Sequence, residues 1–362
     1  SDWFRHGHHS DKAYDSVILH VVSEADTEIT RTNGEQIPQL LLTCPENVRL
    51  HYHELCVADQ YPACHPILAS LPKLTIHSWL TALQTERLEQ KARLITQRLA
   101  LCNRNWEDAF FITLARNFGF GLNGDAFETW AGLLPFRALD KHRNDLFQIE
   151  AFFYGLAGLL EETFLKKEQE DEYSLRLCKE FRYLQRKFEI GQGMDATLWR
   201  FLRLRPENFP HIRLAQLAYL YQKGDKLFSR LLEAETLADV RTLLDARTSP
   251  YWENHYLFGR PSSQKEKTMG ERSKDLIIIN TVVPFLYTYG LHKTDERMCE
   301  RAGRFLEELK AESNHIIRSW SDAGLPVVSA ADSQALIQLQ KEYCDKRKCL
   351  YCRFGYEYLK HT

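Results

Sequence analysis

The sequence predicts an α+β protein in which a small N-terminal β-meander precedes a large all-helical domain. Short apolar and β-branched runs separated by turn residues occur near the start of the chain. From residue 77 onward, apolar residues instead recur at helical spacing. With 362 residues the chain is long enough for two domains. We expect a β-rich domain over residues 1–75 and a helical domain over residues 76–362, ending in a cysteine-rich segment.

The predicted meander consists of short strands joined by a tight turn. Residues 16–22 are a short apolar run, and residues 27–32 alternate between polar and other side chains. Asn33-Gly34 is the strongest short hairpin signal, and residues 36–43 return as an apolar strand. Such a meander is too small to be stable by itself, so we expect it to require further packing partners.

The helical domain follows from apolar positions three and four residues apart, interrupted by glycine and proline. Pro284 is expected to kink its helix. A polar loop over residues 251–273 is the best candidate for a mobile or functional loop. Helices are expected at residues 77–99, 107–118, 148–165, 212–221, 227–232, 237–244, 276–289, 305–320 and 332–343.

The overall charge and the cysteine pattern exclude several classes of protein. Lys and Arg total 47 against 49 for Asp and Glu, which excludes a strongly basic coat for nucleic acid but not a local basic groove. No apolar run approaches the roughly 20 residues that span a bilayer, so no membrane partner is expected. The nine cysteines are mostly scattered and no signal-peptide pattern opens the chain, which favours a reducing cytoplasm.

Histidines and carboxylates cluster near the N-terminus. Imidazole and carboxylate groups together can bind a divalent cation such as Mg or Mn, or move protons near neutral pH. The alternative is that His20 is structural, bonded to backbone or to Tyr14, and that the other histidines are exposed in loops. The catalytic candidates are His6, His8, Asp11, Tyr14 and His20.

The C-terminal cysteines form the second candidate site. Cys344-x4-Cys349-x2-Cys352 places three thiols at a spacing that suits tetrahedral zinc or an iron–sulfur cluster, with zinc ranked first. A fourth ligand is needed, and Cys299 is the first choice, followed by His361. The alternative is a set of reduced cysteines without metal. A redox-active pair of Cys349 and Cys352 is a weaker third option, because no thioredoxin-like βαβ pattern surrounds it.

A basic stretch with interleaved aromatic residues is the third candidate site. Arginine beside aromatic side chains suits phosphate contact and base stacking, so nucleic acid is a candidate partner. The alternative is a solvated helix face. The candidate residues are Arg200, Arg203, Arg205 and Arg213.

Residues 1–22, SDWFRHGHHSDKAYDSVILHVV, resemble the hallmark of a bacterial family catalogued as a domain of unknown function. The resemblance continues at residues 279–284, 312–314 and 333–336, and at the terminal cysteines. It implies a preceding segment with an acidic strand that is similar to the metal-dependent PD-(D/E)xK nuclease core, although it departs from that core at the lysine. The meander would then be a fragment of a nuclease-like α/β core.

The resemblance therefore implies metal-dependent, nuclease-like processing of nucleic acid, with the key acidic residues upstream of this chain. His6, His8, Asp11 and His20 would lie beside that site. The alternative is a non-enzymatic helical scaffold or interaction protein with a structural metal site. The sequence leaves open whether the protein is an enzyme, and it identifies no protein partner.

Overall fold

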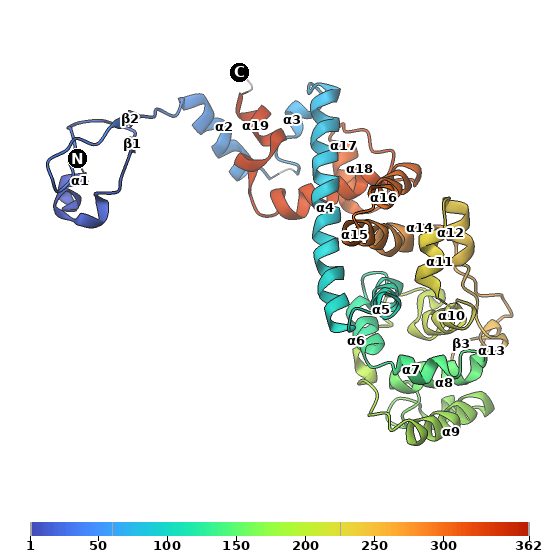
Figure 1. Cartoon of the computed structure of the whole chain (residues 1–362). Helices are drawn as coiled ribbons and strands as arrows, with labels where there is room; N and C mark the ends of the chain where they lie inside the picture. Colours follow the sequence, from blue (N-terminus) through green and yellow to red (C-terminus); the bar gives the residue numbers. More distant parts are fainter. Residues whose placement is uncertain (1, 60, 225, 361–362) are drawn as a thin grey trace. The chain divides into compact units, whose positions relative to one another are not determined.

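The chain folds into two compact units (Figure 1). The computed structural model describes residues 2–59, 61–224 and 226–360. The first, which we call the terminal unit, combines Ser1–Trp79, Arg318–Pro326 and Leu339–Thr362. The second, the central unit, combines Leu80–Ile317 and Val327–Gln338. The described residues are mostly helical with two small sheets, which confirms the predicted fold class; the cysteine-rich C-terminus, however, groups with the N-terminal residues.

A small aromatic core organises the N-terminal segment of the terminal unit. Trp3 packs with Ile29 and Ile37, and its indole Nε1 donates to the Thr30 carbonyl. Because this core is so small, the segment consists mainly of turns and short elements. These are α1 (Asp2–Arg5), the 3₁₀ turns η1 (His8–Ser10) and η2 (Lys12–Tyr14), and the strands β1 (His20–Val22) and β2 (Gln39–Leu41).

The strands of this segment pair differently from a simple meander. The predicted Asn33-Gly34 turn forms, with Gly34 at φ +80° and the Ile37 N–H bonded to the Ile29 carbonyl at 3.0 Å. Beyond that turn β1 and β2 run parallel, with His20 opposite Gln39. The chain between them therefore forms a crossover that carries the hairpin, because parallel neighbours cannot be joined by a tight turn.

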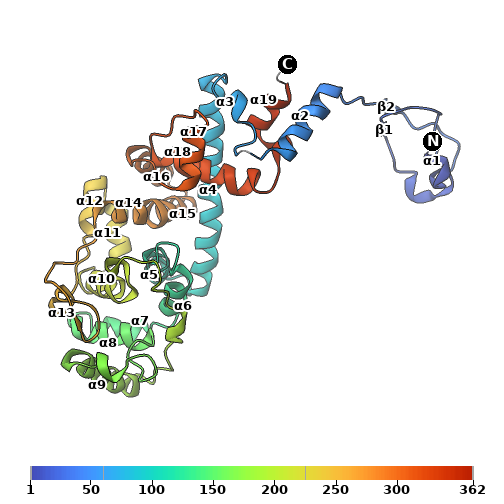
Figure 2. The ribbon, with the colours of Figure 1, turned by 180° about the vertical axis from the view of Figure 1, so that it is seen from behind.

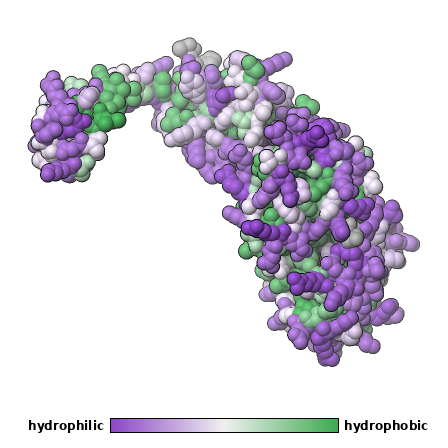
Figure 3. All heavy atoms as spheres, in the orientation of Figure 1, coloured by the Kyte–Doolittle hydropathy of each residue, from purple (hydrophilic) through white to green (hydrophobic). Residues whose placement is uncertain are grey.

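The strand pair exposes apolar side chains. Val21 on β1 is 51% exposed and Leu41 on β2 is 54% exposed. Figure 3 shows apolar atoms gathered on the strand side of this segment. Parallel strands are normally covered on both faces, so this pair is less covered than is usual for its type.

The rest of the terminal unit joins residues from both ends of the chain. Helix α19 (Arg353–Lys360) packs against α2 (Glu46–Val57) and α3 (His65–Leu68), as Figures 1 and 2 both show. The Tyr358 hydroxyl donates to Glu54 at 3.0 Å, and Arg353 donates to Ser78 at 2.7 Å. Helix α17 (His315–Asp322) from Arg318 onward, the π-helical segment η7 (Leu339–Cys344) and the 3₁₀ turn η8 (Cys349–Tyr351) complete this part.

The central unit is a series of neighbouring helices around one apolar core. Helix pairs α5–α6, α8–α9, α8–α10 and α15–α16 make its most extensive contacts, and the members of each pair lie close together in Figures 1 and 2. Its helices are α4 (Lys73–Leu101, from Leu80), α5 (Trp106–Phe118), α6 (Gly124–Gly132), α7 (Phe136–Asp140), α8 (Leu146–Leu156), α9 (Glu172–Lys187), α10 (Pro210–Lys223), α11 (Leu227–Glu233), α12 (Leu237–Leu243), α13 (Pro250–Glu253), α14 (Glu271–Ile277), α15 (Val283–Lys293), α16 (Glu296–Glu308) and α18 (Ala330–Gln338). The turns η3 (Lys167–Gln169), η4 (Ala196–Leu198) and η5 (Pro206–Asn208), the π segment η6 (Ile278–Val282) and the strands β3 (His255–Leu257) and β4 (Arg260–Pro261) connect them.

The apolar periodicity of α4 has the structural role that the sequence predicts. Leu83, Ile95 and Leu99 are all buried, in agreement with a core-facing stripe. Pro284, expected to kink one long helix, lies in the first turn of α15 directly after η6. There its missing N–H and fixed φ are tolerated.

The loop over residues 251–273 is anchored to the central unit. It forms α13 and the antiparallel pair β3–β4. Lys267 is buried and donates to the carbonyls of Trp252 and Glu253, which end α13. Gly259, at φ +61°, donates its N–H to Asp171 at 3.2 Å and lies against the Gln169 backbone, where a side chain would not fit.

Within the described residues, none of the helices combines the length and the apolar character needed to cross a membrane.

Candidate functional site

Three of the N-terminal candidates gather around the Trp3 ring. The ring centroids of His8, Tyr14 and His20 lie 5.5, 5.6 and 5.3 Å from that of Trp3, and those of His8 and Tyr14 are 4.1 Å apart. His20 Nδ1 also lies 3.3 Å from the Gln39 amide. The arrangement is an aromatic cluster with imidazoles at its edge.

The other two N-terminal candidates lie apart from the centre of this cluster. Asp11 caps η2 by accepting the Ala13 N–H at 2.9 Å, and His6 Nε2 lies 3.4 Å from the Arg5 guanidinium. In the described part of the chain, no group of three or more His, Cys, Asp or Glu side chains is set to hold a metal ion. A catalytic or Mg/Mn site at the N-terminus therefore stays a prediction.

The basic stretch divides into exposed and buried arginines. Arg200, Arg203 and Arg205 are exposed. Arg213 is only 5% exposed; its guanidinium donates to Gln216 and Asn208 and lies 4.5 Å from the Phe120 ring centroid. Arg213 is thus part of the core rather than of a phosphate-binding surface, because its charge is enclosed and bonded internally. Nucleic-acid contact by the exposed arginines stays a prediction.

The three C-terminal cysteines lie together in the terminal unit. Cys344, Cys349 and Cys352 line one narrow apolar cavity, and Cys64, just before α3, lines the same cavity. Cys299, the predicted fourth ligand, lies on α16 in the central unit, where its thiol donates to the Tyr287 carbonyl at 3.6 Å. His361, the other candidate ligand, lies outside the described residues.

Irregular helical turns bring the three C-terminal cysteines to the cavity. Cys344 ends η7, where Asp345 N–H bonds to the Gln340 carbonyl at 2.8 Å in the five-residue spacing of a π-helix. Cys349 begins η8, and Cys352 follows η8 directly before α19. Such π-helical turns inside helices occur frequently at functional sites, because the extra residue redirects side chains.

Burial and mutual proximity raise the pKa values of the thiols at this cavity. Burial raises the pKa of Cys64, and the neighbouring Cys352 and Cys349 raise it further. Burial likewise raises the pKa of Cys344, with Cys352 and Cys64 adding to it. The four sulfur atoms therefore influence one another directly, as expected for groups that share one cavity.

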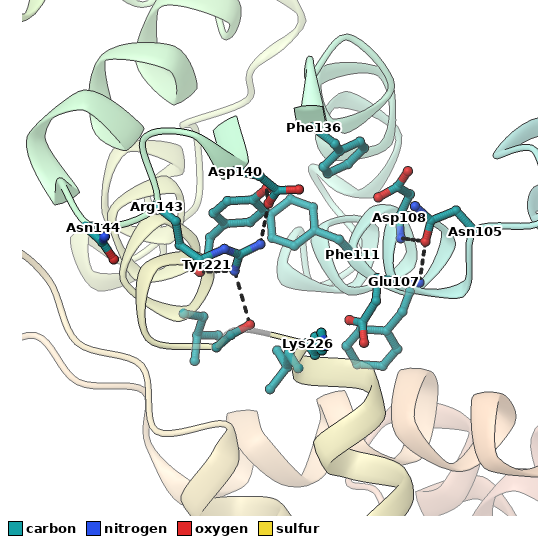
Figure 4. Close-up of a pocket in the computed structure, with 14 residues that line it drawn as sticks. Asn105, Glu107, Asp108, Phe111, Phe136, Asp140, Arg143, Asn144, Tyr221 and Lys226 are labelled. Atoms are coloured by element: carbon teal, nitrogen blue, oxygen red, sulfur yellow. Dashed lines mark hydrogen bonds and ion pairs between the residues drawn. The ribbon is translucent and has the colours of Figure 1, made fainter. Parts of the chain in front are cut away.

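A second cavity, of about 510 Å³, lies in the central unit (Figure 4). Asp108 on α5 and Asp140 at the end of α7 line it, with the ring of Phe111 between them in Figure 4. Asp140 accepts hydrogen bonds from the Tyr221 hydroxyl, at 2.8 Å, and from Arg143, at 2.5 Å. Arg143 also donates to the Tyr221 carbonyl at 2.7 Å, which fixes this side of the cavity.

The carboxyl of Asp108 has an altered proton affinity. Burial raises the pKa of Asp108 to about 6, and the negative charges of Asp140 and Glu107 contribute. A carboxyl that titrates near neutral pH can accept or donate a proton. The cavity therefore combines an aromatic wall with a group suited to proton exchange.

Three segments that carry the family resemblance meet in a polar network. Lys91 on α4 donates to Asn280 Oδ1 at 3.0 Å and to Gln334 Oε1 at 2.9 Å. The Gln334 amide in turn donates to Glu312. Asn280 lies in the π segment η6. The network joins residues 279–284, 312–314 and 333–336 within the central unit.

Sequence reasoning did not identify Cys64, Asp108 or Lys91. Cys64 looked like one scattered thiol, although its position beside prolines at a helix start was visible. Asp108 and Lys91 carry no local signal, because their surroundings come from residues distant in sequence.

A family model described as a protein of unknown function (DUF2851) matches residues 1–315. No curated protein and no solved structure matches the chain.

Proposed function

The chain belongs to the DUF2851 family of proteins of unknown function, so we propose its function from its own geometry. We propose that it is a helical scaffold protein that carries a metal centre at its C-terminal cysteines. The observation that carries this proposal is the position of Cys344, Cys349 and Cys352 along one apolar cavity. The metal holds the C-terminal segment against α2 and α3. Zinc ions and iron–sulfur clusters are both bound by cysteine thiolates.

The surroundings of the cysteines support a fastening role. α19 makes its contacts with α2 and α3 from the opposite end of the chain. Arg347 donates to the carbonyls of Leu55 and Cys56, which end α2. Since loop closure over so long a separation is entropically costly, a metal centre at this junction contributes folding free energy.

Elemental analysis of the purified chain of residues 1–362 tests this proposal. We expect a stoichiometric metal that is lost in Cys349→Ala and in Cys352→Ala but retained in Cys178→Ala. Cys178 is a matched control because it is half-buried in the central unit, where it donates to the Leu160 carbonyl. Absence of any metal from protein purified anaerobically would contradict the proposal.

A second candidate is the nuclease-like function. The observation that favours it is the parallel pairing of β1 with β2, beside the cluster of His8, Tyr14 and His20. Parallel pairs belong to α/β sheets, as a nuclease-like core would require. The test is incubation of the protein that carries the implied upstream acidic segment with DNA and RNA in the presence of Mg or Mn; if no form is cleaved, this candidate fails.

A further inference from the structure

The spacing of the C-terminal cysteines matches an iron–sulfur pattern. Cys344-x4-Cys349-x2-Cys352 has the C-x4-C-x2-C spacing of plant-type [2Fe–2S] proteins, which take their fourth cysteine from a distant position. Here that distant position precedes the motif. Cys64 lies where the fourth ligand is needed, on the same cavity as the other three thiols.

Cys64 is held at this cavity by the fold of both chain ends. It directly precedes α3, and α3 packs against α19, whose first residue follows Cys352. Ser319 donates to the Tyr61 carbonyl at 3.0 Å and so ties the segment before Cys64 to α17. The position of Cys64 is therefore set by tertiary contacts that do not depend on its own thiol.

One indole N–H group at the cavity is buried without a hydrogen-bond partner among the described residues. Trp320 lines the cavity and is fully buried, and its Nε1 is this atom. The indole of Trp79, by contrast, hydrogen-bonds to the thiol of Cys352. A buried unpaired N–H is destabilising, and a sulfur-rich cofactor supplies an acceptor for it.

The charges and backbone donors around the cavity suit an anionic cofactor. The Arg347 guanidinium lines the cavity and acts electrostatically on Cys349. The backbone N–H groups of Phe354 and Gly355, at the start of α19, point to Cys352. Positive charge and N–H donors at a helix N-terminus stabilise thiolates and cluster sulfurs.

We infer that the metal centre is an iron–sulfur cluster held by four thiolates, those of Cys64, Cys344, Cys349 and Cys352. This inference rests on the proposed function and specifies its cofactor and its fourth ligand. Each thiol loses its proton when it binds iron. Cys299 is not a ligand, because it lies in the central unit bonded to Tyr287.

A single zinc ion is the competing occupant of this cavity. One zinc with bonds of about 2.3 Å would draw its four thiolates to roughly 3.8 Å from one another. The four thiols instead line a cavity, and in the described part of the chain no group of three or more such side chains is set to hold a metal ion. A cluster spreads its thiolates over more than one iron, so it requires less convergence of the four thiols than a single zinc ion does.

The experiment uses the chain of residues 1–362, purified anaerobically and reconstituted with ferric iron and sulfide. We expect iron and acid-labile sulfide in equal amounts, with visible sulfur-to-iron charge-transfer absorption. Cys64→Ala should lower the iron content about tenfold or more, whereas Cys299→Ala should retain it. Cys64→Ser should retain part of the iron but change the electron paramagnetic resonance spectrum of the reduced cluster, because an oxygen replaces a thiolate.

The outcomes separate the inference from the proposed function. A protein that takes up zinc but no iron overturns the inference and leaves the proposed function standing, whereas a protein without any metal overturns both. Wild-type iron and spectra in both Cys64 variants overturn the role of Cys64. If neither variant folds, the alkylation rate of wild-type Cys64 is compared before and after iron removal. Faster alkylation after removal supports Cys64 as an iron ligand, and an unchanged rate overturns that role.

Discussion

At the scale of single residues, the central unit buries several titratable side chains within its core. Glu150 on α8 is fully buried and accepts a hydrogen bond from the Tyr173 hydroxyl, and burial raises its pKa to about 7. His211 is also buried, and loss of hydration lowers its pKa to about 3. Both side chains are therefore neutral over part of the pH range in which they would be charged in water, because the protein interior disfavours charge.

Replacing Glu150 by Gln should stabilise the protein at neutral and higher pH. The carboxyl loses its proton near pH 7 in the folded chain but near pH 4.5 in the unfolded chain, so its burial costs stability as pH rises through that window. The free energy of unfolding of Glu150→Gln should exceed that of the wild type by up to about 3 kcal/mol above this window and match it below. Urea titrations at several pH values measure this; Glu172→Gln, on the exposed side of α9, is the control. A constant difference at all pH values would contradict it.

Replacing Asp140 by Asn should lower the pKa of Asp108. Removing the negative charge of Asp140 takes away one of the causes that raise this pKa, leaving burial and Glu107. Carboxyl-carbon NMR titration measures the change. Tyr221→Phe is the matched control, because it removes the hydrogen bond to Asp140 without removing its charge. An unchanged pKa in Asp140→Asn would show that the two carboxyls do not interact.

At the scale of elements, short irregular turns position the cysteines while regular helices support them. η7 and η8 carry Cys344 and Cys349, and α19 approaches Cys349 at Gly355. A Cβ at Gly355 would lie 2.2 Å from the Cys349 carbonyl oxygen. Helix α19 can therefore approach η8 only because this position lacks a side chain.

Gly355→Ala should destabilise the terminal unit and lower its metal content. The Cys349 peptide must shift to make room for the methyl group, at a cost of about 1–3 kcal/mol. Gly303→Ala on α16 is the matched control: nothing lies near its added Cβ, so it should stabilise its helix by up to about 1 kcal/mol. Thermal unfolding and metal analysis of both variants measure the effects. Equal behaviour of the two variants would refute the steric argument.

At the scale of the whole molecule, the terminal unit is assembled from three separate stretches of chain, whereas the central unit is nearly continuous. The terminal unit therefore depends on contacts between distant residues, such as Tyr358 with Glu54. The central unit has its own large core, from Leu88 to Ala331. The two units should respond differently to loss of the C-terminus.

Deletion of residues 339–362 should unfold α2 and α3 but leave the central unit folded. The deletion removes α19 and three of the cavity cysteines, so α2 and α3 lose their packing partner. Hydrogen exchange localises the effect: amide protection should fall in α2 and persist in α8 and α10. Equal loss of protection in α8 would show that the central unit requires the C-terminus.

The sequence by itself determined the features that depend on near neighbours: the helical stripe of α4, the turn at Asn33-Gly34 and the Cys344-x4-Cys349-x2-Cys352 motif. These patterns are local, because helix periodicity and turn chemistry act over a few residues. Only the tertiary structure decided that Cys64 joins the motif, that Arg213 is buried, that β1 pairs parallel to β2, and that Asp108 shares a cavity with Asp140. The reason is physical: burial, pKa and ligand sets arise from groups far apart in the chain, and one-dimensional spacing carries no record of which distant segments pack together.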